Sequence, residues 1–135
     1  MKPRWRIGKR RDTFRTWQLE VGMMTFEQLE AWREAKALAV RAKPLATDFG
    51  LRDQIQRAAV SIMSNIAEGY ERMHILEKRQ FYNAARASCG EVRSQLHLLR
   101  EIGFIRDTDF VLLADKANRV GRLTSGLLRS IENRR

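Results

Sequence analysis

The order of apolar and polar residues along the chain predicts four amphipathic helices, and the pattern is clearest between Gln54 and Gly69. Apolar residues recur there at steps of three and four, which places them in one stripe of a helix: Leu51, Ile55, Ala59, Ile62 and Ile66. Beside that stripe runs a second line of small or polar residues: Gln54, Ala58, Ser61, Asn65 and Glu68. Gly69 is predicted to end the helix, because glycine accepts the backbone conformation that follows a last helical turn.

A shorter helix is predicted before this one. Thr25 and Gln28 have the spacing of a capping box, so the helix is expected to begin at Thr25. Pro44 disfavours helical geometry at Lys43, so the helix is expected to end near that residue. Its inward stripe would consist of Leu29, Trp32, Ala35 and Ala39, flanked by Leu38 and Ala42.

Two further helices are predicted in the second half of the chain. The third spans about Leu76 to Ile102 and is ended by Gly103. Its predicted buried stripe is Phe81, Ala85, Ser88, Val92, Leu96, Leu99 and Ile102. The fourth follows Thr108, a candidate N-cap, and Phe104 and Ile105 are expected to pack the intervening turn. Its predicted stripe is Phe110, Leu113, Ala117, Val120, Leu127 and Ile131.

A polar network is predicted where the second and third helices meet. The third helix repeats the polar line of the second with Ser88, Glu91 and Gln95. These would pair with Gln54, Arg57, Ser61, Asn65 and Glu68. Such a buried network commonly fixes the register of two helices. A catalytic pair formed by Glu68 and Glu91 is the other interpretation, and the neighbouring arginine and amides favour the structural one.

The composition fits one helical domain. The chain has 135 residues, 44% of them hydrophobic, with only 8 Gly and 2 Pro. We expect an all-α, up-down antiparallel four-helix bundle over residues 25–135, preceded by a basic extension over residues 1–24. The single cysteine, Cys89, excludes an internal disulfide and is expected to pack in the core. Neither a signal peptide nor an apolar run of ~20 residues is present, so a cytoplasmic protein is expected.

The charge points to polyanionic partners. Lys and Arg number 26 against 16 Asp and Glu, a net charge of +10. Four arginines of the third helix recur every seven residues and therefore share one side of it: Arg79, Arg86, Arg93 and Arg100. The row spans about 31 Å, close to one turn of duplex. A phosphate-binding surface and a solvated face remain equally open interpretations.

Other basic residues are candidate phosphate contacts. They are Arg72, Arg119 and Arg122, together with Lys9, Arg10 and Arg11 in the extension. The extension also contains Trp5, Phe14 and Trp17, which could stack on bases. A disordered tail without function is the alternative for residues 1–24.

Motifs of enzymes, metals and cofactors are absent from the sequence. It has no glycine-rich phosphate loop, no His-Glu-x-x-His and no Glu-x-x-His pair of the di-iron type. We therefore expect no catalytic activity, no metal and no cofactor.

Several residues resemble a known family. Arg57-Ala58, Ser61-Ile62 and Asn65-Ile66-Ala67-Glu68-Gly69 are similar to the signature of four-helix bundle proteins encoded in intervening sequences of bacterial 23S rRNA genes. The resemblance extends from Phe26 to Ile131 and includes Leu29, Trp32, Ala35, Ala85, Ser88, Glu91, Gln95 and Gly103-Phe104-Ile105. The accessory variability determinant (Avd) proteins of diversity-generating retroelements have a similar fold.

The resemblance implies a homopentameric ring, and it implies as partners a reverse transcriptase and its structured RNA. Together with the charge, it leads us to expect a non-catalytic scaffold that binds RNA or DNA, mainly through backbone contacts. The alternative is a protein-interaction scaffold with no specific nucleic-acid role.

Overall fold

The computed structural model describes residues 25–42 and 49–132, and they form helices joined by short connections. A 3-10 turn, η1 (Phe26–Gln28), precedes α2 (Glu30–Ala42). Three long helices follow: α3 (Phe49–Glu71), α4 (Ile75–Glu101) and α5 (Asp107–Glu132). The described part of the chain is therefore all-α, as predicted.

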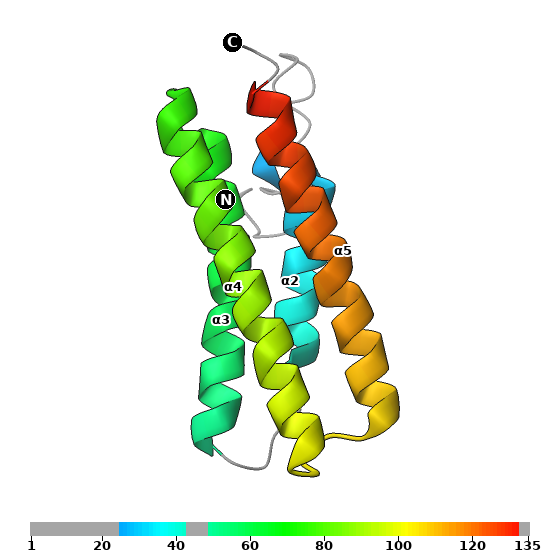
Figure 1. Ribbon diagram of the computed structural model, residues 1–135. Helices are drawn as coiled ribbons and strands as arrows, with labels where there is room; N and C mark the ends of the chain where they lie inside the picture. Colours follow the sequence, from blue (N-terminus) through cyan, green and yellow to red (C-terminus); the bar gives the residue numbers. More distant parts are fainter. Residues whose placement is uncertain (1–24, 43–48, 133–135) are drawn as a thin grey trace, which may run out of the picture.

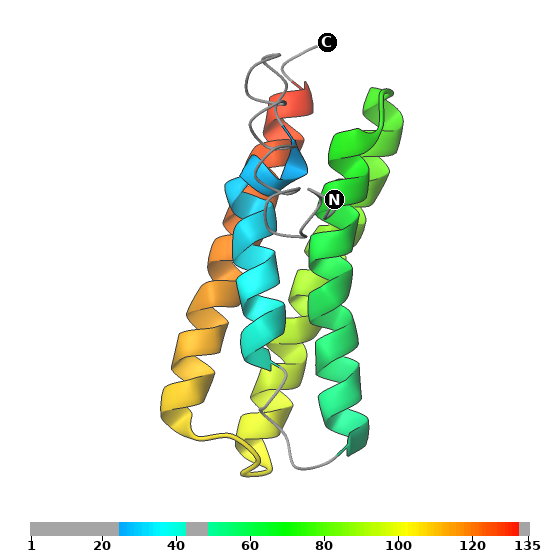
Figure 2. The same ribbon diagram turned by 180° about the vertical axis from the view of Figure 1, so that it is seen from behind.

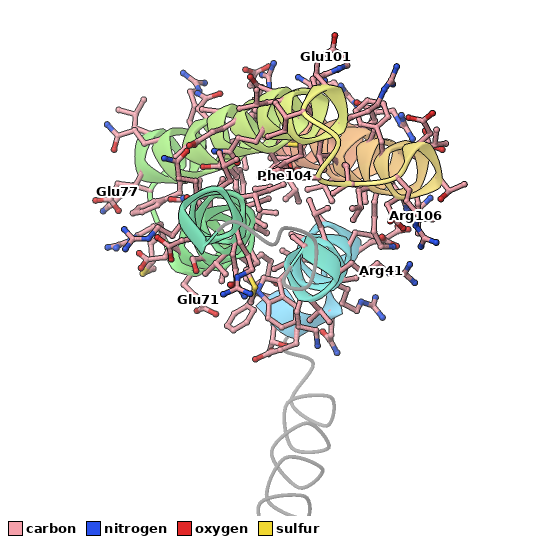
Figure 3. The ribbon with its side chains drawn as sticks, turned by 90° about the horizontal axis from the view of Figure 1, so that it is seen from below. Arg41, Glu71, Glu77, Glu101, Phe104 and Arg106 are labelled. Atoms are coloured by element: carbon pink, nitrogen blue, oxygen red, sulfur yellow. The ribbon has the colours of Figure 1, made fainter. Side chains whose placement is uncertain are left out.

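The helices form a bundle in which each packs against two neighbours. α3 contacts α2 and α4, while α5 contacts α4 and α2. The two views of the ribbon show α4 and α5 side by side in one layer, with α2 and α3 in the other (Figures 1 and 2). Viewed end on, α4 and α5 present a broad face on the side away from α2 (Figure 3). None of the helices within the described ranges is long and apolar enough to cross a membrane.

The first helix begins later than predicted. The capping box of Thr25 and Gln28 is present, but it caps the short turn η1. Leu29 then adopts an extended conformation with ψ 126°, so the α-helix starts at Glu30. The cap was recognised correctly, and the break at Leu29 has no proline or glycine signal in the sequence. α2 is described up to Ala42, and Lys43, near which the helix was expected to end, lies outside the described residues.

Gly69 does not end α3, contrary to the prediction. The helix continues to Glu71, and Gly69 lies within it. A Cβ atom at Gly69 would lie 2.6 Å from Cε1 of Tyr82, which is closer than real contacts allow. Gly69 therefore permits close packing of α3 on α4, and it lies within α3 without ending the helix.

The turn between α4 and α5 follows the prediction at its first residue. Gly103 has φ 79°, the left-handed conformation that ends a helix and that glycine adopts without strain. α5 starts at Asp107, so Thr108 lies inside the helix and is not its N-cap. Ile105 is buried as expected, whereas Phe104 and Ile102 are exposed.

The core consists of the apolar stripes of all four helices. Leu38, Ile55, Ile62, Ile66, Val92, Leu96, Leu99 and Val120 are fully buried. Trp32, Phe81 and Leu127 were predicted to be in the core and are only partly buried. Tyr82 and Leu128, which follow Phe81 and Leu127 in the sequence, take buried positions instead, and Cys89 is buried as expected. Thr124 is also buried, and its hydroxyl donates a hydrogen bond to the carbonyl of Val120 at 2.8 Å.

Candidate nucleic-acid interface

A groove lined by arginines runs between α4 and α5. Its main part is a hollow of about 880 Å³. Arg86 and Arg93 of α4 line one wall, and Arg122 and Arg129 of α5 line the other. All four side chains are exposed. Asn83, Asn118 and Ser125 add neutral hydrogen-bonding groups between them.

A second hollow of about 320 Å³ continues the groove toward the end of α5. The two hollows share Asn83, Arg86, Ser125 and Arg129, so they form one continuous surface. The second hollow adds Arg79, which is half-buried and whose Nε is buried without a hydrogen-bond partner within the described residues.

The arginines of the two walls alternate along the groove. Arg122 and Arg129 are seven residues apart, as are the arginines of α4, so each row keeps to one side of its helix. Gly121 lies opposite Cys89, because a Cβ at Gly121 would be 3.6 Å from the Cys89 Sγ. In this antiparallel register, Arg122 falls between Arg93 and Arg86, and α5 interleaves its charges with those of α4.

Little acid opposes this charge. Glu132 is the one carboxylate among the residues that line the two hollows in the described structure, against five arginines. Arg93 donates a hydrogen bond to Oδ1 of Asn118 across the groove at 3.3 Å, a neutral contact that leaves its charge uncompensated. Guanidinium groups in such a setting suit phosphate, which they can bind with two parallel hydrogen bonds.

Cys89 lies at the floor of the groove and has a packing role. Its thiol donates a hydrogen bond to the carbonyl of Ala117 at 2.9 Å, and the side chain is 3% exposed. Burial raises the pKa of the Cys89 thiol, although the positive charge of Arg93 opposes that effect. The thiol is therefore neutral near pH 7 and unreactive.

Three predicted phosphate contacts lie outside the groove and are paired with acids. Arg100 forms an ion pair with Asp107 at 3.7 Å, and its guanidinium stacks over the ring of Phe110. Arg72 forms an ion pair with Glu68 at 2.9 Å and stacks over Phe81. Of the four arginines in the predicted row on α4, only Arg79, Arg86 and Arg93 therefore line the groove.

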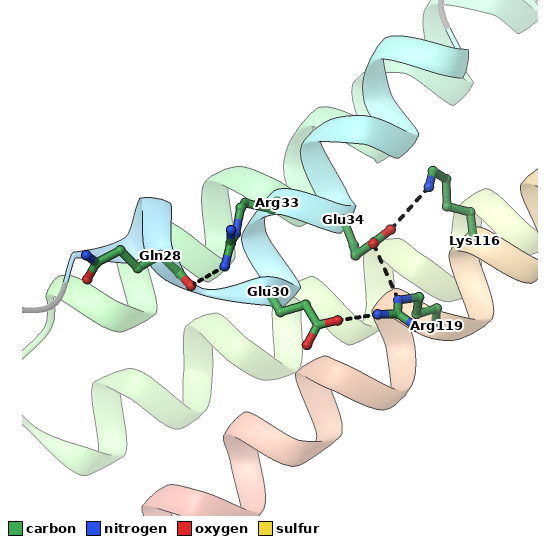
Figure 4. A network of polar contacts seen from close by, with 6 residues as sticks. All are labelled: Gln28, Glu30, Arg33, Glu34, Lys116 and Arg119. Carbon is green, nitrogen blue, oxygen red and sulfur yellow. Dashed lines mark hydrogen bonds and ion pairs between the residues drawn. The ribbon is translucent and has the colours of Figure 1, made fainter. Parts of the chain in front are cut away.

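Arg119, the third of these residues, joins an ion-pair cluster between α5 and α2 (Figure 4). It contacts Glu30 and, at 3.4 Å, Glu34, which also accepts a hydrogen bond from Lys116 at 3.2 Å. Near Glu30, the guanidinium of Arg33 donates a hydrogen bond to the backbone carbonyl of Gln28. These charges hold the short α2 against α5, and they are not available to a phosphate without breaking the cluster. Lys9, Arg10 and Arg11 lie outside the described residues.

The predicted polar network between α3 and α4 exists only at its centre. The hydroxyls of Ser61 and Ser88 are hydrogen-bonded at 2.9 Å, and Asn65 Nδ2 donates to Ser61 Oγ at 3.0 Å. The register set by Ser61 and Ser88 places Glu68 and Glu91 about ten residues apart along the bundle, or ~15 Å. The two carboxylates therefore do not form the pair that a shared catalytic site would need.

The other predicted members of the network bond within their own helices. Arg57 forms an ion pair with Asp53, Glu68 pairs with Arg72, and Gln95 donates to Glu91 at 3.3 Å. Gln54 is exposed. Long side chains at the edges of the contact can reach solvent or the next turn, whereas the short Ser61 and Ser88 side chains bond to each other across the contact.

Only part of the second wall of the groove was predicted from the sequence. Arg122 was a candidate phosphate contact, whereas Arg129 was not among the candidates. The seven-residue step from Arg122 to Arg129 was the available signal, since it matches the step on α4.

Comparisons with known proteins give one family and one fold. A sequence model of the family described as 23S rRNA-intervening sequence protein matches residues 27–126. The crystal structure of a protein of unknown function from the S23 ribosomal protein family of Bacteroides thetaiotaomicron superposes with a TM-score of 0.70. The match is 20% identical in sequence and covers 73% of this chain and 95% of the other, so it shows a shared fold alone. A comparison with functionally curated proteins gives no match.

Proposed function

The chain belongs to the family of 23S rRNA-intervening sequence proteins, and we propose that it binds RNA or DNA through the groove between α4 and α5. The observation that carries the proposal is the clustering of five arginines with one carboxylate along a single open groove. On other faces of the described structure several basic residues are paired with acids, among them Arg72 and Arg119. The name of the family is consistent with a role connected to nucleic acid.

Binding would be dominated by phosphate contacts. Each arginine that neutralises a phosphate releases counterions, so the affinity should fall steeply as salt rises. Asn83, Asn118 and Ser125 can add hydrogen bonds to phosphate or sugar oxygens. Such contacts position a nucleic acid without reading its bases, so we propose little sequence specificity.

The test compares two variants of equal charge. Arg86→Gln/Arg122→Gln removes one arginine from each wall of the groove. Arg57→Gln/Arg106→Gln is the matched control, because those side chains are 80% and 81% exposed and each pairs with an acid three or four residues away in the sequence. Both variants lower the net charge from +10 to +8, so any difference between them reports the location of the charge.

The readout is fluorescence anisotropy of a labelled RNA at near-physiological salt. We expect the groove variant to bind about tenfold more weakly or worse, with a salt slope reduced by about 1.4 for two lost contacts to a single strand. The control should bind within about twofold of the unaltered chain. Equal effects of the two variants would contradict the groove as the site and favour the protein-interaction scaffold.

We further propose that the chain assembles as a homopentameric ring and acts without catalysis. The support for the ring is the resemblance to ring-forming relatives and the presence of exposed apolar side chains outside the core, including Val60, Leu98 and Val111. Five chains of 15.8 kDa would give a particle of 79 kDa with a net charge of +50. Light scattering at several protein concentrations tests this, and a monomer at all of them would contradict it.

A reverse transcriptase and its structured RNA are the proposed partners in the cell. This step rests on the resemblance to Avd proteins of diversity-generating retroelements. A reverse transcriptase encoded beside this chain, and retained by it in a pull-down only when the RNA is present, would support the proposal. Retention that is unchanged by ribonuclease and by the groove variant would instead indicate direct protein contact.

A further inference from the structure

The groove is straight, and this limits what it can hold along its whole length. It follows two adjacent helices side by side (Figure 1). Arg79 and Arg93 are 14 residue steps apart on α4, which gives about 21 Å of wall. The floor between the walls is made of small residues, among them Ala87 and Gly121, so a narrow chain can enter between the arginines.

A duplex cannot follow such a groove. Each backbone of B-form DNA makes a full turn in ~34–36 Å, so within about 21 Å it has passed more than halfway round the axis. Its phosphates therefore leave a straight groove after a small part of a turn. A duplex lying on α4 and α5 would bring only about two or three phosphates within reach of the arginines.

An unpaired strand has no such restriction, because its backbone can be straightened. Running lengthwise, it would pass Arg93, Arg122, Arg86, Arg129 and Arg79 in turn. No aromatic residue lines either hollow in the described structure, so the groove offers no platform on which bases would stack. The charged walls favour the phosphates inside and leave the bases facing solvent.

We propose that the groove holds one unpaired nucleic-acid strand lengthwise, with its phosphates between the two arginine walls and its bases turned outward. The inference rests on the proposed function, since it assumes that the groove is the binding site. It goes further by naming the form of the ligand and the direction in which it lies. A strand with outward bases remains free to pair or to be read by another protein.

Salt dependence separates the two forms of ligand. Five phosphate contacts to a single strand predict a slope of log affinity against log salt of about −3.5. Two or three contacts to a duplex predict a slope of about −1.8 to −2.7. Outward bases also predict that two homopolymers of similar flexibility bind alike.

The experiment uses the full chain and three labelled nucleic acids of about 12 nucleotides per strand, close to the site sizes of known single-strand binders. These are oligouridine, oligocytidine and a mixed-sequence DNA duplex, each titrated from about 50 to 200 mM salt. We expect the two single strands to bind within about threefold of each other and the duplex at least about tenfold more weakly.

Two results would overturn the inference. One is duplex binding as tight as single-strand binding. The other is a large difference between oligouridine and oligocytidine, which would mean that bases enter the groove. In either case the proposed function stands if Arg86→Gln/Arg122→Gln still weakens binding more than Arg57→Gln/Arg106→Gln. The proposed function itself fails if the groove variant and the control variant bind every nucleic acid alike.

Discussion

Replacing Gly69 with alanine should destabilise the bundle, although alanine is the better helix former. Gly69 lies inside α3 and faces the buried ring of Tyr82, which is 2% exposed. A Cβ atom there would be 2.6 Å from Cε1 and 2.8 Å from Cδ1 of Tyr82, and 3.1 Å from the Cβ of Phe81. Neither the ring of Tyr82 nor the Cβ of Phe81 is the free end of a flexible side chain, so α3 and α4 would have to move apart.

Two opposing terms set the size of the effect. In a helix interior alanine is favoured over glycine by about 1 kcal/mol. Overpacking a well-filled core costs about 1–3 kcal/mol. We expect the second term to win, with a net loss of up to about 2 kcal/mol in the free energy of unfolding.

Gly90 provides the matched control. It also lies inside a helix, but the nearest atom to an added Cβ is a guanidinium nitrogen of Arg93 at 3.8 Å. Gly90→Ala should therefore stabilise the protein by about 0.5–1 kcal/mol. Urea unfolding followed by far-UV circular dichroism measures both variants. Equal stabilisation by the two alanines would refute the close packing of α3 on α4 at Gly69.

Three further predictions concern single contacts. Ser61→Ala and Ser88→Ala should each cost about 1 kcal/mol, and a double-mutant cycle should show that the two losses are not additive, because the hydroxyls bond to each other. Glu34→Gln should cost about 1 kcal/mol at low salt, since its carboxylate contacts Lys116 and Arg119, and less in ~1 M NaCl, where screening shortens the range of charge interactions. Burial raises the pKa of the Cys89 thiol, so the folded state keeps a proton that the unfolded chain loses above about pH 8.5. The free energy of unfolding should therefore fall as pH rises from there through the folded pKa, and a pH series of urea titrations should show a smaller fall for Cys89→Ala.

Periodicity predicted the helices well because burial follows it directly. The stripe of Ile55, Ile62 and Ile66 is fully buried, and the predicted bounds of α4 differ by one residue at each end. Errors occurred where one residue type serves two purposes. Gly69 was interpreted as a helix end, and the sequence alone does not distinguish that role from close packing against a residue such as Tyr82.

About half of the candidate site could be predicted from the sequence. A seven-residue step placed Arg79, Arg86 and Arg93 on one side of a helix, and the structure keeps them there. Which helix lies beside them depends on how α4 and α5 pack, so the facing arginines of α5 were not connected to them. Ion pairing also depends on tertiary packing, and this is why Arg119 was counted as available when it contacts Glu30 and Glu34.

The most direct test of the central claim is to locate bound RNA on the chain. The full-length protein would be photo-crosslinked to an RNA that carries azidophenacyl groups on backbone phosphorothioates, because the phosphates are proposed to lie in the groove, and the crosslinked peptides would be identified by mass spectrometry. The proposed groove predicts crosslinks in α4 between residues 79 and 93 and in α5 between residues 118 and 132, reduced in Arg86→Gln/Arg122→Gln. Crosslinks confined to residues 1–24, or to α2 and α3, would contradict it.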